Sequence, residues 1–119
     1  MKIKDITLNK DETLIKALEM IKNSGLRCII ITNEIKVAIG TLSEGDILDG
    51  ILRGQSIHSP IKNFFNRNFT FLNDKTTNQQ KNVILFENFK KGITIIPVLN
   101  DKGIPVNYYD YREFLNKKN

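Results

Sequence analysis

The first third of the chain carries apolar residues at the spacing of an amphipathic helix. They recur at i, i+3, i+4 and i+7, at Leu14, Ala17, Leu18 and Ile21. This stripe predicts a helix that Asp11 caps at its start and Gly25 ends, because short polar side chains suit the first position and glycine the last. Residues 27–32 are a β-branched run typical of a buried strand, and residues 35–42 follow as a returning strand.

A second helix is predicted to begin at Ser43 and to end at Gly54. Residues 55–68 then form a connector between the two halves of the chain. Its apolar anchors are Ile61, Phe64 and Phe65. These side chains make the connector too hydrophobic for a free linker, so we expect it to pack against the folded chain.

The second half of the chain repeats the plan of the first. An offset of 67 residues lays residues 25–34 over residues 92–101, and the offset is 68 in the preceding helix and 63 in the first strand. The matching elements are strands at 69–72, 93–99 and 104–108 and helices at 79–91 and from 111 onward. Each half therefore predicts strand, helix, strand, strand, helix, which makes the chain an α+β fold of two β-α-β-β-α repeats.

The two repeats are placed at residues 1–66, which include the connector, and at residues 67–119. Neither half has enough apolar residues for a core of its own, so we expect the two to pack about a pseudo-twofold axis as one domain. A chain of 119 residues also leaves no room for a multidomain enzyme.

Composition and charge narrow the class of protein further. Hydrophobic residues make up 40% of the chain and charged residues 26%, which is typical of a globular domain. The net charge of +5 suits an anionic partner. The basic residues are scattered, however, and they form no long block, so nucleic acid is a poor fit as that partner.

Metal and disulfide chemistry have few candidate residues. Cys28 is the only cysteine and His58 the only histidine. One cysteine forms no intramolecular disulfide and His58 has no Cys or acidic neighbour at ligand spacing, so we expect Cys28 in the core and no metal site or catalytic histidine. No export signal or membrane-length apolar stretch is visible, and we expect a cytoplasmic protein without a membrane partner.

The repeat plan and its motifs resemble the paired CBS domain, or Bateman module. The residues that carry this resemblance are 11–14, 17–18, 40–47 (GTLSEGDI) and 96–98. A narrower match in residues 40–54, 56–61 and 66–68 is similar to the CBS pair at the N-terminus of bacterial sugar-1-phosphate nucleotidyltransferases, including guanylyltransferases of legionaminic acid and related surface-glycan pathways. The likeness implies a non-catalytic regulatory segment whose nucleotidyltransferase partner is fused to it or encoded separately.

Ser43 and Asp46 are the leading candidate site residues. A strand end meets a helix N-terminus there, where free N–H groups and the helix dipole can hold a phosphate and a carboxylate can accept two ribose hydroxyls. The resemblance assigns Asp46 to the ribose, Ser43 to the adjoining phosphate edge, and Gly40 and Thr41 to the same motif. The same spacing is also a capping box, in which Ser43 caps the helix and Asp46 returns a hydrogen bond, and both roles can hold together.

The resemblance also implies a base slot lined from the second repeat. Its residues are Thr70, Phe71, Thr94, Ile95, Ile96 and Pro97. Most of these are equally expected as ordinary core residues.

The corresponding site of the second repeat is degraded. At the 67-residue offset Gly40, Ser43 and Asp46 are replaced by Asn107, Asp110 and Glu113. Two carboxylates in one small anion site repel a phosphate, so the Asp110 and Glu113 pair is better interpreted as a helix cap. We expect one working nucleotide site per pair of repeats.

The leading hypothesis is a regulatory module that binds AMP, ATP or a guanine nucleotide as a homodimer, needs no cofactor and acts on a nucleotidyltransferase. The first alternative is a ligand-free dimerisation module. The second is a small basic nucleic-acid-binding domain, which lacks a clustered basic face or a known motif.

Overall fold

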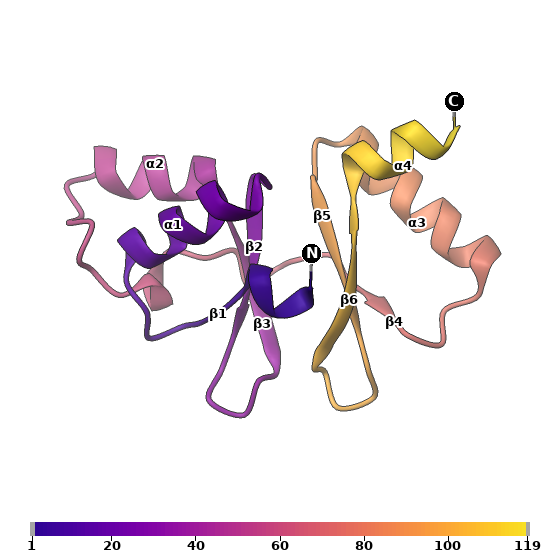
Figure 1. Ribbon diagram of the computed structural model, residues 1–119, viewed down its shortest axis with the longest axis horizontal. Helices are drawn as coiled ribbons and strands as arrows, with labels where there is room; N and C mark the ends of the chain where they lie inside the picture. The colour runs from indigo at the N-terminus through magenta and orange to yellow at the C-terminus, as the bar shows by residue number, and fades with distance from the viewer. Residues whose placement is uncertain (1, 119) are drawn as a thin grey trace. The chain divides into compact units, whose positions relative to one another are not determined.

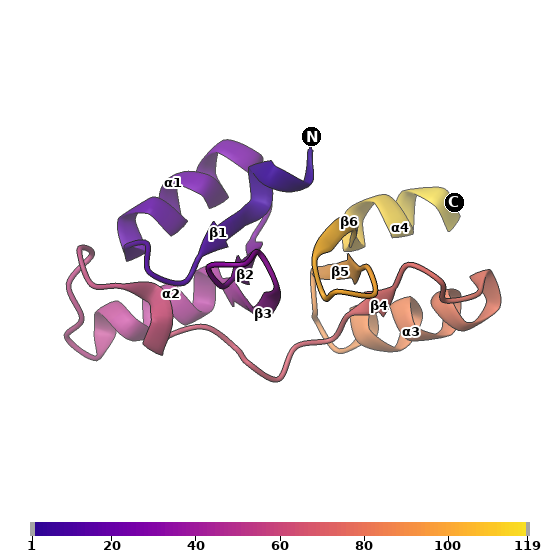
Figure 2. The ribbon, with the colours of Figure 1, turned by 90° about the horizontal axis from the view of Figure 1, so that it is seen from below.

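Two compact units make up the chain, Met1–Phe69 and Thr70–Asn119. The computed structural model describes the backbone of residues 2–118 and the side chains of residues 2–114. Each unit contains a three-stranded sheet with its two α-helices on one face (Figures 1 and 2). The predicted α+β fold of two repeats is confirmed.

The first unit has the order that the sequence predicts, with two short 3-10 helices added. Its elements are η1 (Ile3–Ile6), β1 (Thr7–Asn9), α1 (Leu14–Ser24), β2 (Cys28–Thr32), β3 (Ala38–Ser43), α2 (Glu44–Leu52) and η2 (Ile61–Asn63). Strand β2 lies between β1, which is parallel to it, and β3, which is antiparallel. All five residues of β2 are buried, so the central strand forms the floor of the core.

Helix α1 begins at a different cap from the one predicted. Thr13, not Asp11, is the N-cap, and its side-chain oxygen accepts a hydrogen bond from the Lys16 N–H at 3.4 Å. Asp11 instead donates its own N–H to the Asn9 side chain at 2.9 Å, within the turn that leads into the helix. Gly25 ends the helix as predicted, at φ 72°, a left-handed conformation that favours glycine.

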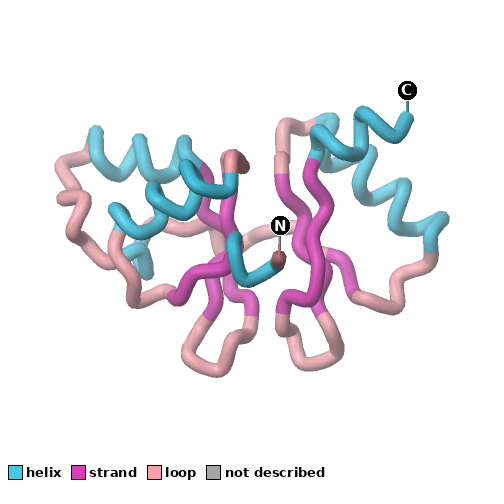
Figure 3. The backbone as a smooth tube through the Cα atoms, viewed as in Figure 1, coloured by secondary structure: helices cyan, strands magenta, loops and turns pink. Residues whose placement is uncertain are grey.

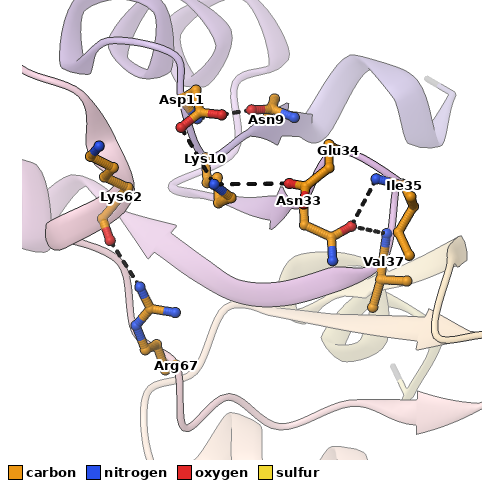
Figure 4. Close-up of polar contacts among 9 residues, drawn as sticks. All are labelled: Asn9, Lys10, Asp11, Asn33, Glu34, Ile35, Val37, Lys62 and Arg67. Carbon is orange, nitrogen blue, oxygen red and sulfur yellow. Dashed lines mark hydrogen bonds and ion pairs between the residues drawn. The ribbon is translucent and has the colours of Figure 1, made fainter.

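The turn between β2 and β3 is longer than the sequence predicts. Asn33 closes it by accepting the N–H groups of Ile35 and Val37 at 3.1 and 3.0 Å (Figure 4). Lys36 takes the left-handed conformation at φ 68°. Strand β3 therefore begins at Ala38 and not at residue 35.

The connector packs on the first unit, as predicted. Asn66 exchanges two backbone hydrogen bonds with Thr41 of β3, at 2.8 and 3.0 Å, and so extends the sheet beyond β3. Ile61 is fully buried and Phe65 is 8% exposed. The Arg67 guanidinium closes the end of the connector, where it donates to the Lys62 carbonyl at 3.0 Å (Figure 4).

The second unit repeats the architecture of the first, with a three-stranded sheet and two α-helices (Figure 3). Its elements are β4 (Leu72–Asn73), α3 (Asn78–Lys90), β5 (Ile95–Leu99), β6 (Pro105–Asp110) and α4 (Tyr111–Lys118). The buried residues that form its core are Leu72, Leu85, Phe89, Ile96 and Val98. Asn100 closes the β5–β6 turn as Asn33 closes the β2–β3 turn, by accepting the N–H groups of Lys102 and Ile104.

Strand pairing corrects the predicted register of the first strands. Leu8 pairs with Ile31 in the first unit and Leu72 pairs with Val98 in the second, so the two strands match at an offset of 64 and not 63. β4 is also shorter than predicted and shorter than β1. The position before Leu72 lies opposite Pro97, which has no N–H to donate to a neighbouring strand.

Candidate functional site

Ser43 and Asp46 form the capping box at the junction of β3 and α2. The Ser43 Oγ accepts the Asp46 N–H at 3.1 Å, and Asp46 Oδ2 accepts the Ser43 N–H at 3.1 Å. Ser43 is extended, at φ −100° and ψ 164°, as an N-cap residue is. The capping interpretation of this motif is therefore confirmed, and the question becomes what binding capacity remains.

Both side chains keep unused hydrogen-bonding capacity. Ser43 Oγ uses a lone pair to accept the Asp46 N–H. Its hydroxyl proton has no acceptor among residues 2–114. Asp46 Oδ1 likewise accepts no bond from that part of the chain. A hydroxyl that can donate thus lies beside a carboxylate oxygen that can accept, and both side chains are half-buried.

The helix N-terminus offers fewer free amides than the sequence suggests. The Glu44 N–H donates to the Arg27 carbonyl at 3.0 Å and the Asp46 N–H is used in the capping box. In the first turn this leaves the Gly45 N–H, which has no partner within the described residues. Gly45 is exposed, and nothing closer than Ser43 Oγ, at 3.7 Å, would meet a Cβ there.

A surface cavity of about 440 Å³ borders Asp46 within the first unit. Asp49 and Arg53 of α2 line it together with Asn63 and Phe64 of the connector. Asp49 and Arg53 form an exposed ion pair at 3.2 Å. The volume is in the range of small-molecule sites, so Asp46 has room for a ligand on its solvent side.

Gly40 and Thr41 have structural roles in this motif. A Cβ at Gly40 would collide with the Phe65 ring and the Asn66 carbonyl, so glycine is required for the connector to approach β3. Thr41 holds the connector through its backbone bonds to Asn66. Their contact with a nucleotide stays a prediction.

Cys28 is a neighbour of the Ser43–Asp46 site. The sequence predicts only that this cysteine lies in the core. It is 7% exposed and pairs with Ser43 across β2 and β3. Burial raises the pKa of the Cys28 thiol to about 12 and outweighs a hydrogen bond with Thr41, which lowers the pKa, while the Asp46 charge adds a smaller rise. The thiol is therefore neutral and unreactive at physiological pH. The pairing of Cys28 with Ser43 in the sheet is the observation that places this thiol beside the site.

The predicted base-slot residues fall into two groups within the second unit. Ile95, Ile96 and Pro97 are buried in β5, as the core interpretation expects. The others flank the strands at Thr70, Phe71 and Thr94. Thr70 is half-buried and donates its hydroxyl to Asn88 Oδ1 at 3.0 Å, while Phe71 is 51% exposed.

The β6–α4 junction of the second unit carries a buried charge where the first unit carries a hydroxyl. Asp110 is 6% exposed, and its Oδ1 accepts the Arg112 N–H at 3.1 Å, so it caps α4 as predicted. The Arg112 guanidinium lies 3.4 Å from Oδ2. Glu113 is exposed in the first turn of α4.

Metal-binding clusters and membrane-length helices are absent from the part of the chain that the structure describes. No group of three or more His, Cys, Asp or Glu side chains in the described chain is placed to hold a metal ion. His58 is exposed in the connector. None of the described helices is long and apolar enough to cross a membrane.

Comparison with known proteins identifies the class of fold. Residues 1–53 match the family model of the CBS domain. OpuCA of Staphylococcus aureus has a similar structure, with a TM-score of 0.79 and 18% identity over 95% of this chain and 90% of that chain. No curated protein sequence gives a significant match.

Two further solved structures carry ligands. A CBS domain protein of Pyrobaculum aerophilum complexed with AMP matches at a TM-score of 0.76 and 18% identity, over 91% of this chain and 81% of that one. The CBS domain pair of protein MJ0100, in complex with 5′-methylthioadenosine and S-adenosyl-L-methionine, matches at a TM-score of 0.79 and 15% identity over 100% of both chains. The chain thus has the fold of a CBS-domain pair, and its first 53 residues match the CBS domain itself.

Proposed function

We propose that this chain is a non-catalytic regulatory module that binds a purine nucleotide at the β3–α2 junction. The observation that carries the proposal is the spare capacity of the capping box. Asp46 Oδ1 accepts, the Ser43 hydroxyl and the Gly45 N–H donate, and a cavity borders Asp46. In this arrangement Asp46 holds the ribose hydroxyls, and Ser43 with Gly45 holds the phosphate edge.

The similar structures support a nucleoside ligand. One is complexed with AMP and another with 5′-methylthioadenosine and S-adenosyl-L-methionine. All three ligands contain an adenosine group. AMP or ATP is therefore our first candidate, with a guanine nucleotide as the second, and Gly40, Thr41 and the second-unit residues named above remain predicted contacts.

The regulated partner that we propose is a sugar nucleotidyltransferase, fused to this chain or separate, in the cytoplasm. The proposal rests on the likeness of residues 40–54 to the corresponding segment of such enzymes. Regulation would occur by population shift, because a ligand that binds one conformation more tightly than another changes their ratio. The partner enzyme would respond to that ratio.

A dimerisation module is the second candidate function, and exposed apolar residues of α2 favour it. Leu48 is 58% exposed and Leu52 is 77% exposed, one helical turn apart. Such residues are suited to packing against the helix of a second copy. A homodimer is compatible with nucleotide binding, whereas a purely structural dimer needs no ligand.

Calorimetric titration and thermal unfolding with AMP, ATP, GTP and CMP test the proposal. A ligand at 100 times its Kd stabilises the fold by about 2.7 kcal/mol, so at least one purine nucleotide should raise the Tm. CMP is the control for a nonspecific effect of phosphate. Sedimentation at increasing concentration reports the dimer separately, and a dimer whose Tm no nucleotide changes would favour the structural function.

A further inference from the structure

A second cavity lies wholly within the second unit, where α3 and α4 cover β6. Its volume of about 230 Å³ is the space of about eight water molecules at about 30 Å³ each, enough for one small molecule. The side chains that carry the argument below and line this cavity are Lys81, Leu85, Tyr109, Asp110, Glu113 and Phe114. The cavity is separate from the β3–α2 junction, which belongs to the first unit.

The first unit fills the equivalent place with its own connector. At the offset of 68 residues Lys81 corresponds to Thr13, which forms a backbone bridge with Pro60. The Ile61 N–H donates to the Glu12 carbonyl at 2.8 Å, and the Ile61 side chain is fully buried. In the second unit the described residues leave a cavity beside Lys81 instead. The first unit thus holds an aliphatic side chain near the position that is open in the second.

Two opposite charges line this cavity without pairing with each other. Lys81 is half-buried, its ammonium lies 5.2 Å from the centre of the Tyr109 ring, and it donates one hydrogen bond to Asn78 Oδ1 at 3.1 Å. Neither this ammonium nor the Glu113 carboxylate forms an ion pair within residues 2–114. An ammonium that still has N–H groups to donate and a carboxylate that can accept therefore line one cavity.

The rest of the lining is apolar or already neutralised. Asp110 is 6% exposed, and the Arg112 guanidinium lies 3.4 Å from its Oδ2. Leu85 belongs to the buried core of the second unit, and Tyr109 and Phe114 pack against that core as half-buried residues. The walls between the two unpaired charges therefore suit an aliphatic group.

We propose that this cavity binds a free α-amino acid with an aliphatic side chain, such as leucine. The ligand's carboxylate accepts from the Lys81 ammonium, its ammonium donates to the Glu113 carboxylate, and its side chain packs on Leu85 and Phe114. A purely anionic or cationic ligand fits less well, because it leaves one of the two protein charges without a partner. The inference goes beyond the proposed function and does not depend on it, because the two sites lie in different units.

NMR titration of the full ¹⁵N-labelled chain with three ligands of similar shape tests the two charge contacts. Leucine is compared with 4-methylpentanoate, which lacks the ammonium, and with 3-methylbutylamine, which lacks the carboxylate. Leucine should bind at least about tenfold more tightly than either analogue, because each analogue loses one charge-assisted hydrogen bond. The amide signals that shift should be those of residues 81–85 and 109–114.

Variants then assign each contact to its side chain. Lys81→Met should lower the affinity for leucine about tenfold and leave that for 3-methylbutylamine unchanged, because the amine has no carboxylate to lose a partner. Glu113→Gln should lower the affinity for leucine and leave that for 4-methylpentanoate unchanged. Lys90→Met and Glu87→Gln, at exposed positions of α3 outside the cavity, are the matched controls and should change none of the three affinities.

Three results would overturn the inference. The first is a folded wild-type chain whose signals do not shift with leucine. The second is equal affinity for leucine and its two analogues, which would mean that the charges recognise nothing. The third is an equal loss for all three ligands in Lys81→Met, which would make the lysine a structural support of the cavity. None of these results bears on AMP, whose affinity is measured separately.

Discussion

The β3–α2 and β6–α4 junctions share a backbone hydrogen bond and differ in the charge of the side chain that caps the helix. In both, the first N–H of the helix donates to the backbone carbonyl at the start of the neighbouring strand, at 3.0 Å. The cap is the neutral Ser43 hydroxyl in the first unit and the buried Asp110 carboxylate in the second. The Asp110 carboxylate forms an ion pair with the Arg112 guanidinium, whereas the Ser43 hydroxyl still has a proton that it can donate.

This difference shows that the repeat conserves the fold of the junction and not its ligand chemistry. Either side chain caps a helix, because an accepting oxygen is all that the free N–H groups need. A phosphate distinguishes the two, because a carboxylate repels it and a hydroxyl donates to it. In the proposed function, the exchange of the Ser43 hydroxyl for the Asp110 carboxylate is therefore one reason to expect a single phosphate site.

Gly40 and Asn107 give the largest expected contrast in stability. Gly40→Ala should lower the free energy of unfolding by about 3 kcal/mol, because the new methyl group meets the Phe65 ring and the Asn66 carbonyl. Asn107→Ala, at the equivalent exposed position, should change it by less than about 0.5 kcal/mol. Urea unfolding monitored by circular dichroism measures both, and a loss as small as about 0.5 kcal/mol in Gly40→Ala would show that the connector does not depend on Gly40.

Cys28 should make the first unit sensitive to alkaline pH. Its pKa is raised to about 12 in the folded chain from 9.0, so only the unfolded chain is deprotonated between these values. The contribution is complete below pH 9.0 and is lost as the pH rises toward 12, by about 1.4 kcal/mol per pH unit. Cys28→Val removes the titrating group, and the pH dependence of its unfolding free energy should be shallower than that of the wild type. Identical pH dependence would contradict the burial of the thiol.

Loss of the Ser43 cap should have a smaller effect. Ser43→Ala removes the acceptor for the Asp46 N–H and should destabilise the chain by about 1 kcal/mol. Chemical unfolding at neutral pH is the measurement. No change would mean that the capping box adds nothing to the stability of α2.

Ser43→Asp should change stability least and nucleotide binding strongly. The variant copies Asp110 and retains a capping oxygen, so its unfolding free energy should remain within about 0.5 kcal/mol of wild type. The added charge should lower the affinity for AMP at least tenfold. It should lower the affinity for adenosine, which has no phosphate, much less. Equal weakening of AMP and adenosine in calorimetry would contradict a phosphate contact at Ser43.

The sequence predicts the repeat and most helix ends because each depends on nearby residues. Gly25 ends α1 and Ser43 begins α2 as the pattern indicates, whereas β5 begins at Ile95, two residues later than predicted. The start of α1 was predicted wrongly at Asp11, because Asn9 draws the Asp11 amide into a turn. The short β4 also escaped prediction, since it depends on the proline in the neighbouring strand.

The sequence points to the residues of the candidate site, but it does not show which of their hydrogen-bonding atoms stay available for a ligand. The spacing of Ser43 and Asp46 predicts both a cap and a ligand site, but hydrogen-bond directions decide which atoms stay available. The Glu44 N–H is used by the Arg27 carbonyl, a contact between segments far apart in the sequence.

Calorimetric titration of AMP into two matched variants, Asp46→Asn and Glu113→Gln, tests the central claim most directly. Each removes one charge without changing the shape of the side chain, and the amide in Asp46→Asn retains an acceptor for the Ser43 N–H, so both should stay folded. The account predicts that Glu113→Gln binds like the wild type and that Asp46→Asn binds at least tenfold more weakly. Wild-type affinity in Asp46→Asn, or an equal loss in both variants, would contradict a single nucleotide site at the β3–α2 junction.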